Sequence, residues 1–139
     1  MNYLLDTCVL SEYTRRKPEE KVFKWVDAIA EEELFLSAIT IGEIKNGIER
    51  LENSHRKTEL QVWLNDGIIQ RFGQRILPLD AQTMLVWGSL SAKMGKAGQP
   101  VPVMDSLIVA TALQNNLIIA TRNVSDYLAC GVQLINPWE

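Results

Sequence analysis

Short apolar runs alternate with helical patterns along the whole sequence, and this alternation restricts the chain to few folds. Apolar residues at helical spacing, such as Ile41, Ile44 and Ile48, separate most of the runs. Strands that alternate with helices form βαβ units around a mainly parallel sheet. The sequence therefore predicts an α/β fold with a central, mainly parallel, five-stranded sheet flanked by helices. The expected strands are Tyr3–Leu5, Leu34–Leu36, Ile76–Leu79, Leu117–Ala120 and Val132–Ile135.

The residues within these runs indicate where each strand lies in the sheet. Tyr3–Leu5 and Leu117–Ala120 are continuously apolar, as in central strands that helices cover on both faces. Pro78 lacks a backbone donor, so its strand is expected at one edge, and the alternating Val132–Ile135 suits the other edge. The helix over Met104–Leu113 is apolar almost all round and should be buried. Further helices are expected from Pro18 to Ile29, from Ile41 to Leu51, from Leu60 to Ile68 and from Ala81 to Met94.

Size and composition suit an ordinary globular protein. The 139 residues, 47% of them hydrophobic, fit one domain over residues 1–139. We expect a cytoplasmic protein without membrane contact, because there is no signal peptide pattern and no apolar run of roughly 18 residues. The two cysteines, Cys8 and Cys130, fit reduced thiols. The net charge of −3 argues mildly against a nucleic-acid partner, but divalent ions bound to several acids would attract phosphate.

Acidic and polar residues follow several of the expected strands. Asp6 directly follows the first strand, and Glu43 lies in the first turn of the helix after the second strand. Asp105 opens the buried helix, and Asn123 and Asp126 follow the fourth strand. Ligand sites in open α/β sheets form beyond the carboxyl ends of the strands. We therefore expect these residues to converge on one rim of the sheet.

Each of these residues also has a purely structural interpretation. Asp6 is a possible N-cap, and Thr40 with Glu43 matches a capping box. Asp105 would complement a helix dipole, Asn123 is a common cap or turn residue, and Asp126 could be merely solvated. Both interpretations stay open for single residues. Asp105 favours a functional cluster, because a charge on a buried helix needs a partner or a metal.

Clustered carboxylates without histidine favour a hard cation, Mg²⁺ or Mn²⁺, and not zinc. Such ions activate water and stabilise phosphoryl transfer. The single histidine, His55, lies in a polar connection between helices and is expected at the surface. Cys8 therefore lacks a base, which makes a Cys–His nucleophile improbable. No Walker A or GxGxxG pattern is present, so nucleotide binding lacks its loop.

Five motifs resemble those of PIN-domain toxins and occur in the same order along the whole chain. Residues 3–11 resemble "LLDTNVLS", with Cys8 where asparagine is usual, and residues 36–43 resemble "lSaiTvaEl". Residues 103–110 resemble "aaDaliAAtA", residues 120–127 resemble "aTrNvrdF", and residues 136–138 resemble an "NPW" ending. The similarity is greatest to VapC and the related Fit-type toxins.

This resemblance implies a single PIN domain over residues 1–139 with a parallel sheet in the order 3-2-1-4-5. It implies an endoribonuclease, dependent on Mg²⁺ or Mn²⁺, that is the toxin of a type II toxin–antitoxin system. It also implies an RNA substrate, a homodimer or a toxin–antitoxin hetero-oligomer, and inhibition by a small DNA-binding antitoxin.

The resemblance also implies roles for individual residues. Asp6, Glu43 and Asp105 match the invariant acids of the family, and all three are expected at the metal. Asp6 and Asp105 would hold the principal ion, and Glu43 would bind or orient the attacking water. We expect Asp126 to complete the catalytic and metal site, directly or through water, with Asn123 as a supporting polar contact.

Other residues have expected supporting roles by the same resemblance. Thr7 and Thr121 would supply hydroxyl groups, and Lys45 and Arg122 are weaker candidates for phosphate contacts. Cys8 would remove a hydrogen bond near the first acid and weaken activity.

Two other functions remain open from the sequence. A receiver-like phosphoacceptor domain also places acids at strand ends, but it needs an acidic pair after the first strand and a lysine after a late strand. Asp6 has no acidic neighbour, and the residue after Thr121 is Arg122. A catalytically weak or silent PIN scaffold that binds RNA or protein is the second alternative, because Asn123 replaces one possible ligand.

Overall fold

Five parallel strands form one sheet in the order β3-β2-β1-β4-β5. The computed structural model describes residues 1–139. The expected parallel sheet and its strand order are confirmed, and the two strands predicted for the edges lie there. The strand bounds are β1 Tyr3–Leu5, β2 Leu34–Ser37, β3 Ile76–Leu77, β4 Ile118–Ala120 and β5 Leu134–Ile135.

The strands differ slightly in length from the predicted runs. β3 ends at Leu77 and not at Leu79, because Pro78 has no N–H for the ladder. β4 begins one residue later than predicted, and β5 begins at Leu134 and not at Val132. Apolar runs therefore located the strands but overestimated the hydrogen-bonded part of three of them.

Helices connect the strands and cover both faces of the sheet. The longer helices are α1 (Thr7–Glu12), α2 (Glu20–Ala28), α3 (Ala38–Glu49), α4 (His55–Val62), α6 (Ala81–Lys96) and α7 (Val103–Asn115). The shorter segments are η1 (Glu31–Glu33), η2 (Trp63–Ile68), α5 (Ile69–Phe72), η3 (Gly73–Arg75), α8 (Val124–Tyr127) and η4 (Leu128–Cys130).

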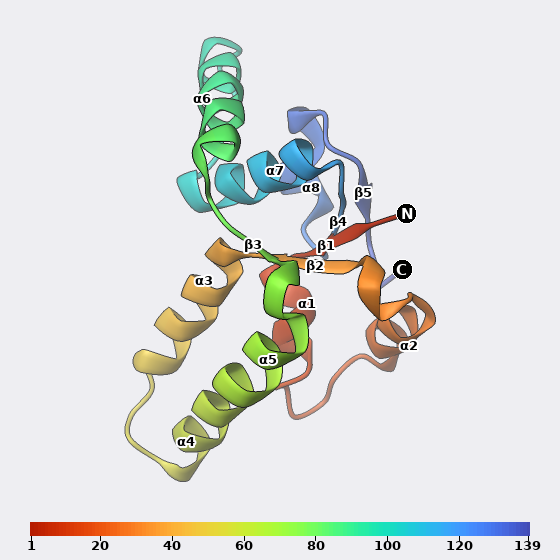
Figure 1. Ribbon diagram of the computed structural model, residues 1–139, viewed down its shortest axis with the longest axis vertical. Helices are drawn as coiled ribbons and strands as arrows, with labels where there is room; N and C mark the ends of the chain where they lie inside the picture. The colour runs from red at the N-terminus through yellow and green to blue at the C-terminus, as the bar shows by residue number, and fades with distance from the viewer.

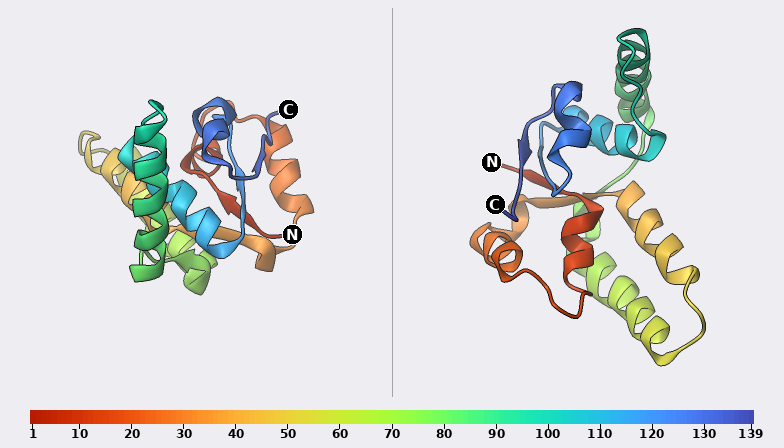
Figure 2. Two further views of the ribbon diagram at one scale, coloured as in Figure 1. Left: turned by 90° about the horizontal axis from the view of Figure 1, so that it is seen from above. Right: turned by 180° about the vertical axis from the view of Figure 1, so that it is seen from behind.

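The helices form two layers around the sheet (Figure 1). α6, α7 and α8 lie on one face, and α1 to α5 lie on the other. α4, η2 and α5 run on as one arm, which extends away from the sheet beside α3, whereas α6 projects from the opposite face (Figure 2). None of the helices has the length and apolar character required to cross a membrane.

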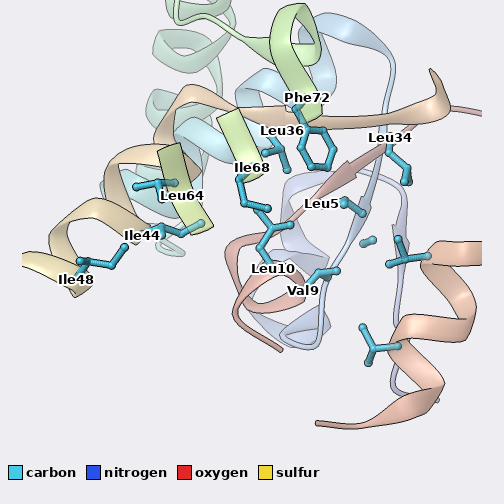
Figure 3. Close-up of a cluster of buried hydrophobic side chains, with 13 residues drawn as sticks. Leu5, Val9, Leu10, Leu34, Leu36, Ile44, Ile48, Leu64, Ile68 and Phe72 are labelled. Carbon is cyan, nitrogen blue, oxygen red and sulfur yellow. The ribbon is translucent and has the colours of Figure 1, made fainter. Parts of the chain in front are cut away.

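Two apolar cores hold the layers together because strand side chains alternate between the faces. Leu5 packs into the first core with Leu10, Leu36 and Phe72 (Figure 3). Leu4 points to the other face and packs into the second core, which α6, α7 and η4 complete. The central strand β1 is thus fixed from both sides, and so is the residue that follows it.

The helix α7 is buried as predicted, but only in its middle. All residues from Ser106 to Ala112 are buried, whereas Met104 and Leu113 near its two ends are exposed. The indole N–H of Trp87 on α6 donates to Ser106 Oγ at 2.9 Å. This hydrogen bond joins α6 to the beginning of α7, close to Asp105.

The start of α3 corrects one structural interpretation of the sequence. The helix begins at Ala38, and the Ser37 hydroxyl accepts the N–H of Ile39 at 3.2 Å. Thr40 is therefore buried inside the helix, and Glu43 lies in the second turn, not in the first. The capping box was a wrong interpretation, because Ser37 caps the helix three residues earlier.

Other helix bounds also differ from the prediction. α2 begins at Glu20 and not at Pro18, and Leu51 lies beyond the end of α3, where it is exposed. The arm formed by α4, η2 and α5 runs from His55 to Phe72 and is therefore longer than the helix predicted from Leu60 to Ile68.

A cluster of charges ties the arm to the beginning of β2. Arg71 donates to both carboxylate oxygens of Glu31, and Arg75 donates to Glu31 Oε2 at 2.8 Å. Arg75 also donates to the main-chain oxygens of Glu31 and Leu34. Hydrogen bonds from Arg71, opposed by partial burial and reinforced by Arg75, lower the pKa of Glu31 from 4.5 to about 2.

We predict that Glu31→Gln lowers the melting temperature at neutral pH by roughly 3 °C. The folded-state pKa of Glu31 is lowered, so the ion pairs stabilise the fold above the ordinary pKa of 4.5 and lose this effect as the pH falls toward about 2. The effect is modest because the Glu31 side chain is 47% exposed. The melting temperatures of both proteins should converge as the pH falls from about 5 to about 2.

The neighbouring exposed residue Glu32 provides the control. Glu32→Gln should leave the melting temperature unchanged across the same pH range. A Glu31→Gln difference that stays constant with pH would rule out the ion pairs as its cause.

Candidate active site

Asp6 lies at the carboxyl end of the central strand and is only 5% exposed. Its Oδ1 accepts the N–H of Thr7 at 2.9 Å, which caps α1. Its Oδ2 accepts the hydroxyl groups of Thr121 at 2.8 Å and Tyr127 at 3.1 Å. The Asp6 amide donates to the Ala120 carbonyl at 3.0 Å, which continues the pairing of β1 with β4. Asp6 therefore caps α1 through Oδ1, as the structural interpretation predicted, and its Oδ2 is held by residues of the segment that follows β4.

Glu43 lies on α3, half-buried, with its carboxylate held by α1. The Thr7 hydroxyl donates to Glu43 Oε1 at 2.6 Å and lies 3.3 Å from the Thr40 hydroxyl. Burial raises the pKa of Glu43, the hydrogen bond from Thr7 opposes this, and the charges of Asp6 and Asp105 raise it further. Asp6 and Asp105 are thus close enough to Glu43 to disfavour its charge.

Asp105 is half-buried in the first turn of α7. Burial raises its pKa, and so do the charges of Asp6 and Asp126, whereas the Tyr127 hydroxyl lowers it. The expected convergence on one rim is therefore present for the three principal acids. We call Asp6, Glu43 and Asp105 the acidic cluster.

Asp126 and Asn123 lie on the outer side of the acidic cluster. Asp126 is exposed on α8, and together with Asp105 it lines a hollow of about 360 Å³ between α8 and the loop before α7. The Asn123 side chain is exposed. Asn123 contacts the site through its main chain, because its N–H donates to Thr121 Oγ1 at 3.0 Å. Thr121 in turn holds Asp6, so Asn123 acts on the cluster only indirectly.

The two basic candidates for phosphate contacts have partners outside the acidic cluster. Lys45 pairs with Glu49 at 2.8 Å on the exposed side of α3. Arg122 lies over the ring of Trp138, 5.6 Å from its centroid. His55 is at the surface, as predicted, and its Nε2 lies 2.8 Å from Glu59.

Sequence reasoning gave no role to Tyr127, although it directly follows Asp126. This side chain is 2% exposed, and its hydroxyl donates to Asp6. Burial, followed by the charges of Asp6 and Asp105, raises the pKa of Tyr127 far above its usual value, so the hydroxyl keeps its proton. The only sequence signal was the tyrosine at position 127, where the quoted family motif ends in phenylalanine.

Cys8 also lies beside Asp6. Its Sγ is 3.9 Å from Asp6 Oδ2 and 3.7 Å from Thr121 Oγ1, and it accepts the N–H of Arg122 at 3.5 Å. Burial raises the pKa of the Cys8 thiol, and the charge of Asp6 raises it further. The thiol is therefore protonated and donates only weakly.

The donors of the acidic cluster fit a hard divalent cation. No three carboxylate, thiol or imidazole side chains converge on one point in the arrangement seen here. Mg²⁺ does not require this, because it usually keeps several waters and binds one or two carboxylates together with substrate phosphate. Burial raises the pKa of Glu43 and Asp105, and the charges of neighbouring acids raise it further. A cation at the site would relieve the part that is due to charge repulsion.

Comparison with known proteins identifies the family. The PIN domain family matches residues 3–125. The toxin FitB of Neisseria gonorrhoeae is 36% identical over 136 residues, which cover 98% of both chains. The VapC ribonuclease Y4jK of Sinorhizobium fredii is 35% identical over 136 residues, 98% of this chain and 97% of that protein. The solved structure of FitAB bound to the IR36 DNA fragment has a TM-score of 0.93 at 34% identity, covering 99% of this chain and 96% of that chain. The chain therefore belongs to the PIN-domain family, in the group of the VapC and Fit-type toxins.

Proposed function

We propose that this protein is an endoribonuclease dependent on Mg²⁺ or Mn²⁺ and the toxin of a toxin–antitoxin pair. The observation that carries the proposal is the acidic cluster, in which Thr7 donates to Asp6 at 2.9 Å and to Glu43 at 2.6 Å. Burial raises the pKa of Glu43 and Asp105, and the charges of neighbouring acids raise it further. Relatives named VapC ribonuclease and toxin FitB support RNA as the substrate and toxicity as the outcome.

Each residue of the site has a distinct part in this proposal. Asp6 and Asp105 would hold the principal ion, and Asp126 would complete the site from its exposed position. A bound Mg²⁺ or Mn²⁺ supplies water activation and neutralises charge on the phosphodiester. Glu43 orients the attacking water and accepts its proton, and Thr7 fixes the carboxylate for this task by its hydrogen bond of 2.6 Å.

The raised pKa of Glu43 suits proton transfer. A carboxylate whose charge is disfavoured by burial and by neighbouring acids accepts a proton more readily than an ordinary glutamate. Thr121 contributes differently, because its hydroxyl holds Oδ2 of Asp6. The site thus contains one carboxylate arranged for proton transfer and others arranged for cation binding.

A neutralising partner is the second part of the proposal. One relative of known structure is FitAB bound to a DNA fragment, which supports a small DNA-binding antitoxin as the partner of this chain. An acidic cluster is best blocked by a cation, and arginine binds carboxylates in a two-pronged fashion. We propose that an antitoxin arginine or lysine enters the acidic cluster in place of the metal.

We predict that Asp105→Asn weakens Mn²⁺ binding near neutral pH by at least about tenfold. The change removes a charged oxygen ligand and keeps the shape of the side chain. Calorimetric titration of Mn²⁺ measures the difference, with Asp66→Asn in the exposed arm as the matched control. Equal affinity in the wild type and Asp105→Asn would end the assignment of the metal site.

We predict that Glu43→Gln lowers ribonuclease activity by about 10²- to 10⁴-fold, the range typical of general-base catalysis. The melting temperature should hold or rise. Because the folded-state pKa of Glu43 is raised, its charge destabilises the fold at neutral pH, and glutamine removes this charge while still accepting from Thr7. Activity on RNA with Mn²⁺ and thermal melting give the two measurements.

Glu52→Gln, in the exposed connection after α3, should change neither activity nor melting temperature. If Glu43→Gln keeps its activity and loses stability, then the glutamate has a structural role and not a catalytic one.

We predict that antitoxin and metal weaken each other's binding by the same factor at equilibrium, because both occupy the acidic cluster. Excess Mn²⁺ should therefore loosen the purified toxin–antitoxin complex, which a dissociation assay at increasing Mn²⁺ measures. Mg²⁺ should act in the same direction, and the same ionic strength of NaCl controls for screening. A partner that binds equally tightly to the metal-saturated protein would place inhibition elsewhere.

A further inference from the structure

The two carboxylate oxygens of Asp6 are held unequally. Oδ2 accepts two hydroxyl groups, from Thr121 at 2.8 Å and from Tyr127 at 3.1 Å. Oδ1 accepts a single N–H, that of Thr7, at 2.9 Å. A carboxylate oxygen has two acceptor sites. Oδ2 is therefore saturated by the protein, whereas Oδ1 retains one acceptor site.

We infer that Tyr127 is a positioning residue for Asp6. Together with Thr121 it occupies Oδ2, so that Oδ1 is the oxygen that meets the cation. The inference rests on the proposed function, because it concerns the same cation site. It adds a residue to that site and assigns the ligand atom of Asp6.

The surroundings of Tyr127 make its hydroxyl a fixed donor. Its ring is buried in the second core with Leu4, Ile108 and Ile119. The packing directs the hydroxyl to the edge of that core, where it lies near both Asp6 and Asp105. A hydroxyl that donates to a carboxylate in a buried place forms a charge-assisted hydrogen bond, which is stronger than one between neutral groups.

Cys8 explains why this donor matters in the present chain. The thiol faces the same oxygen, Asp6 Oδ2, but the distance is 3.9 Å and a thiol is a weak donor. A longer side chain with an amide N–H at position 8 would reach Oδ2 and replace the tyrosine hydroxyl. In this chain Tyr127 is therefore the second strong donor to Oδ2, beside Thr121.

A structural role for Tyr127 has different consequences. If the residue only fills the second core, then Tyr127→Phe keeps the ring and its packing and removes nothing of importance. In that case the Mn²⁺ affinity of Tyr127→Phe equals that of the wild type, and adding Cys8→Asn to Tyr127→Phe does not change it. Metal affinity and rescue from position 8 therefore distinguish positioning from packing.

The experiment compares Tyr127→Phe, Cys8→Asn and the double variant with the wild type. Calorimetric titration gives the Mn²⁺ affinity, and thermal melting reports stability. Tyr127→Phe should weaken Mn²⁺ binding by about 10- to 100-fold, as is typical when a hydrogen-bond partner of a metal ligand is removed. Cys8→Asn alone should change little, and in the double variant it should recover most of the loss, so that the two positions are coupled.

Tyr3→Phe provides the matched control. Its ring packs edge-on against Trp25, 5.0 Å between centroids, and its hydroxyl takes no part in the site. This variant should bind Mn²⁺ as the wild type does.

The outcomes separate the inference from the proposed function. If the wild type binds Mn²⁺ and Tyr127→Phe binds it equally well, the inference is wrong while the proposed site stands. If Tyr127→Phe loses affinity and stability together and Cys8→Asn restores neither, Tyr127 is structural and the inference is wrong as well. A wild type that binds no Mn²⁺ would overturn both the proposed site and the inference.

Discussion

The carboxylate of Asp6 is almost fully buried at the end of the central strand, and a buried charge must be held by donors or by a cation. Its donors come from distant parts of the chain. Thr7 follows it directly, whereas Thr121 and Tyr127 come from the last quarter of the sequence. The pairing of β1 with β4 brings these segments together, so the parallel sheet is a condition for satisfying this single carboxylate.

The two cores then determine how precisely the other acids can approach Asp6. Ile44 and Ile48 anchor α3 in the first core, which leaves Glu43 at the rim of the sheet and not in the apolar interior. Ile108 and Val109 anchor α7 in the second core, and Asp105 lies one turn before them. The acidic cluster is thus built by helices from opposite faces of the sheet, and its geometry depends on the packing of both layers.

Sequence reasoning predicted the features that depend on local pattern. Apolar runs located the five strands, Pro78 identified an edge, and the position of each acid after a strand or at a helix start predicted their convergence. The structural alternative that it kept open for Glu43, a capping box with Thr40, was wrong, because Ser37 and Thr40 are both good caps and only the length of β2 decides between them. It gave no role to Tyr127, because the hydrogen bond to Asp6 spans 121 positions and has no local signature.

The distribution of ion pairs shows what the acidic cluster lacks. Surface acids such as Glu31 and Glu49 have arginine or lysine partners, and those partners lower their pKa. No lysine, arginine or histidine forms an ion pair with the cluster, and its half-buried members Glu43 and Asp105 have raised pKa values. The buried Glu12, in contrast, pairs with Arg15 at 3.2 Å. Burial and the neighbouring acids disfavour the charges of Glu43 and Asp105, so these two residues destabilise the fold at neutral pH. Under the proposed function, a metal ion or a cationic side chain of the antitoxin would relieve this destabilisation, and the relief would favour its binding.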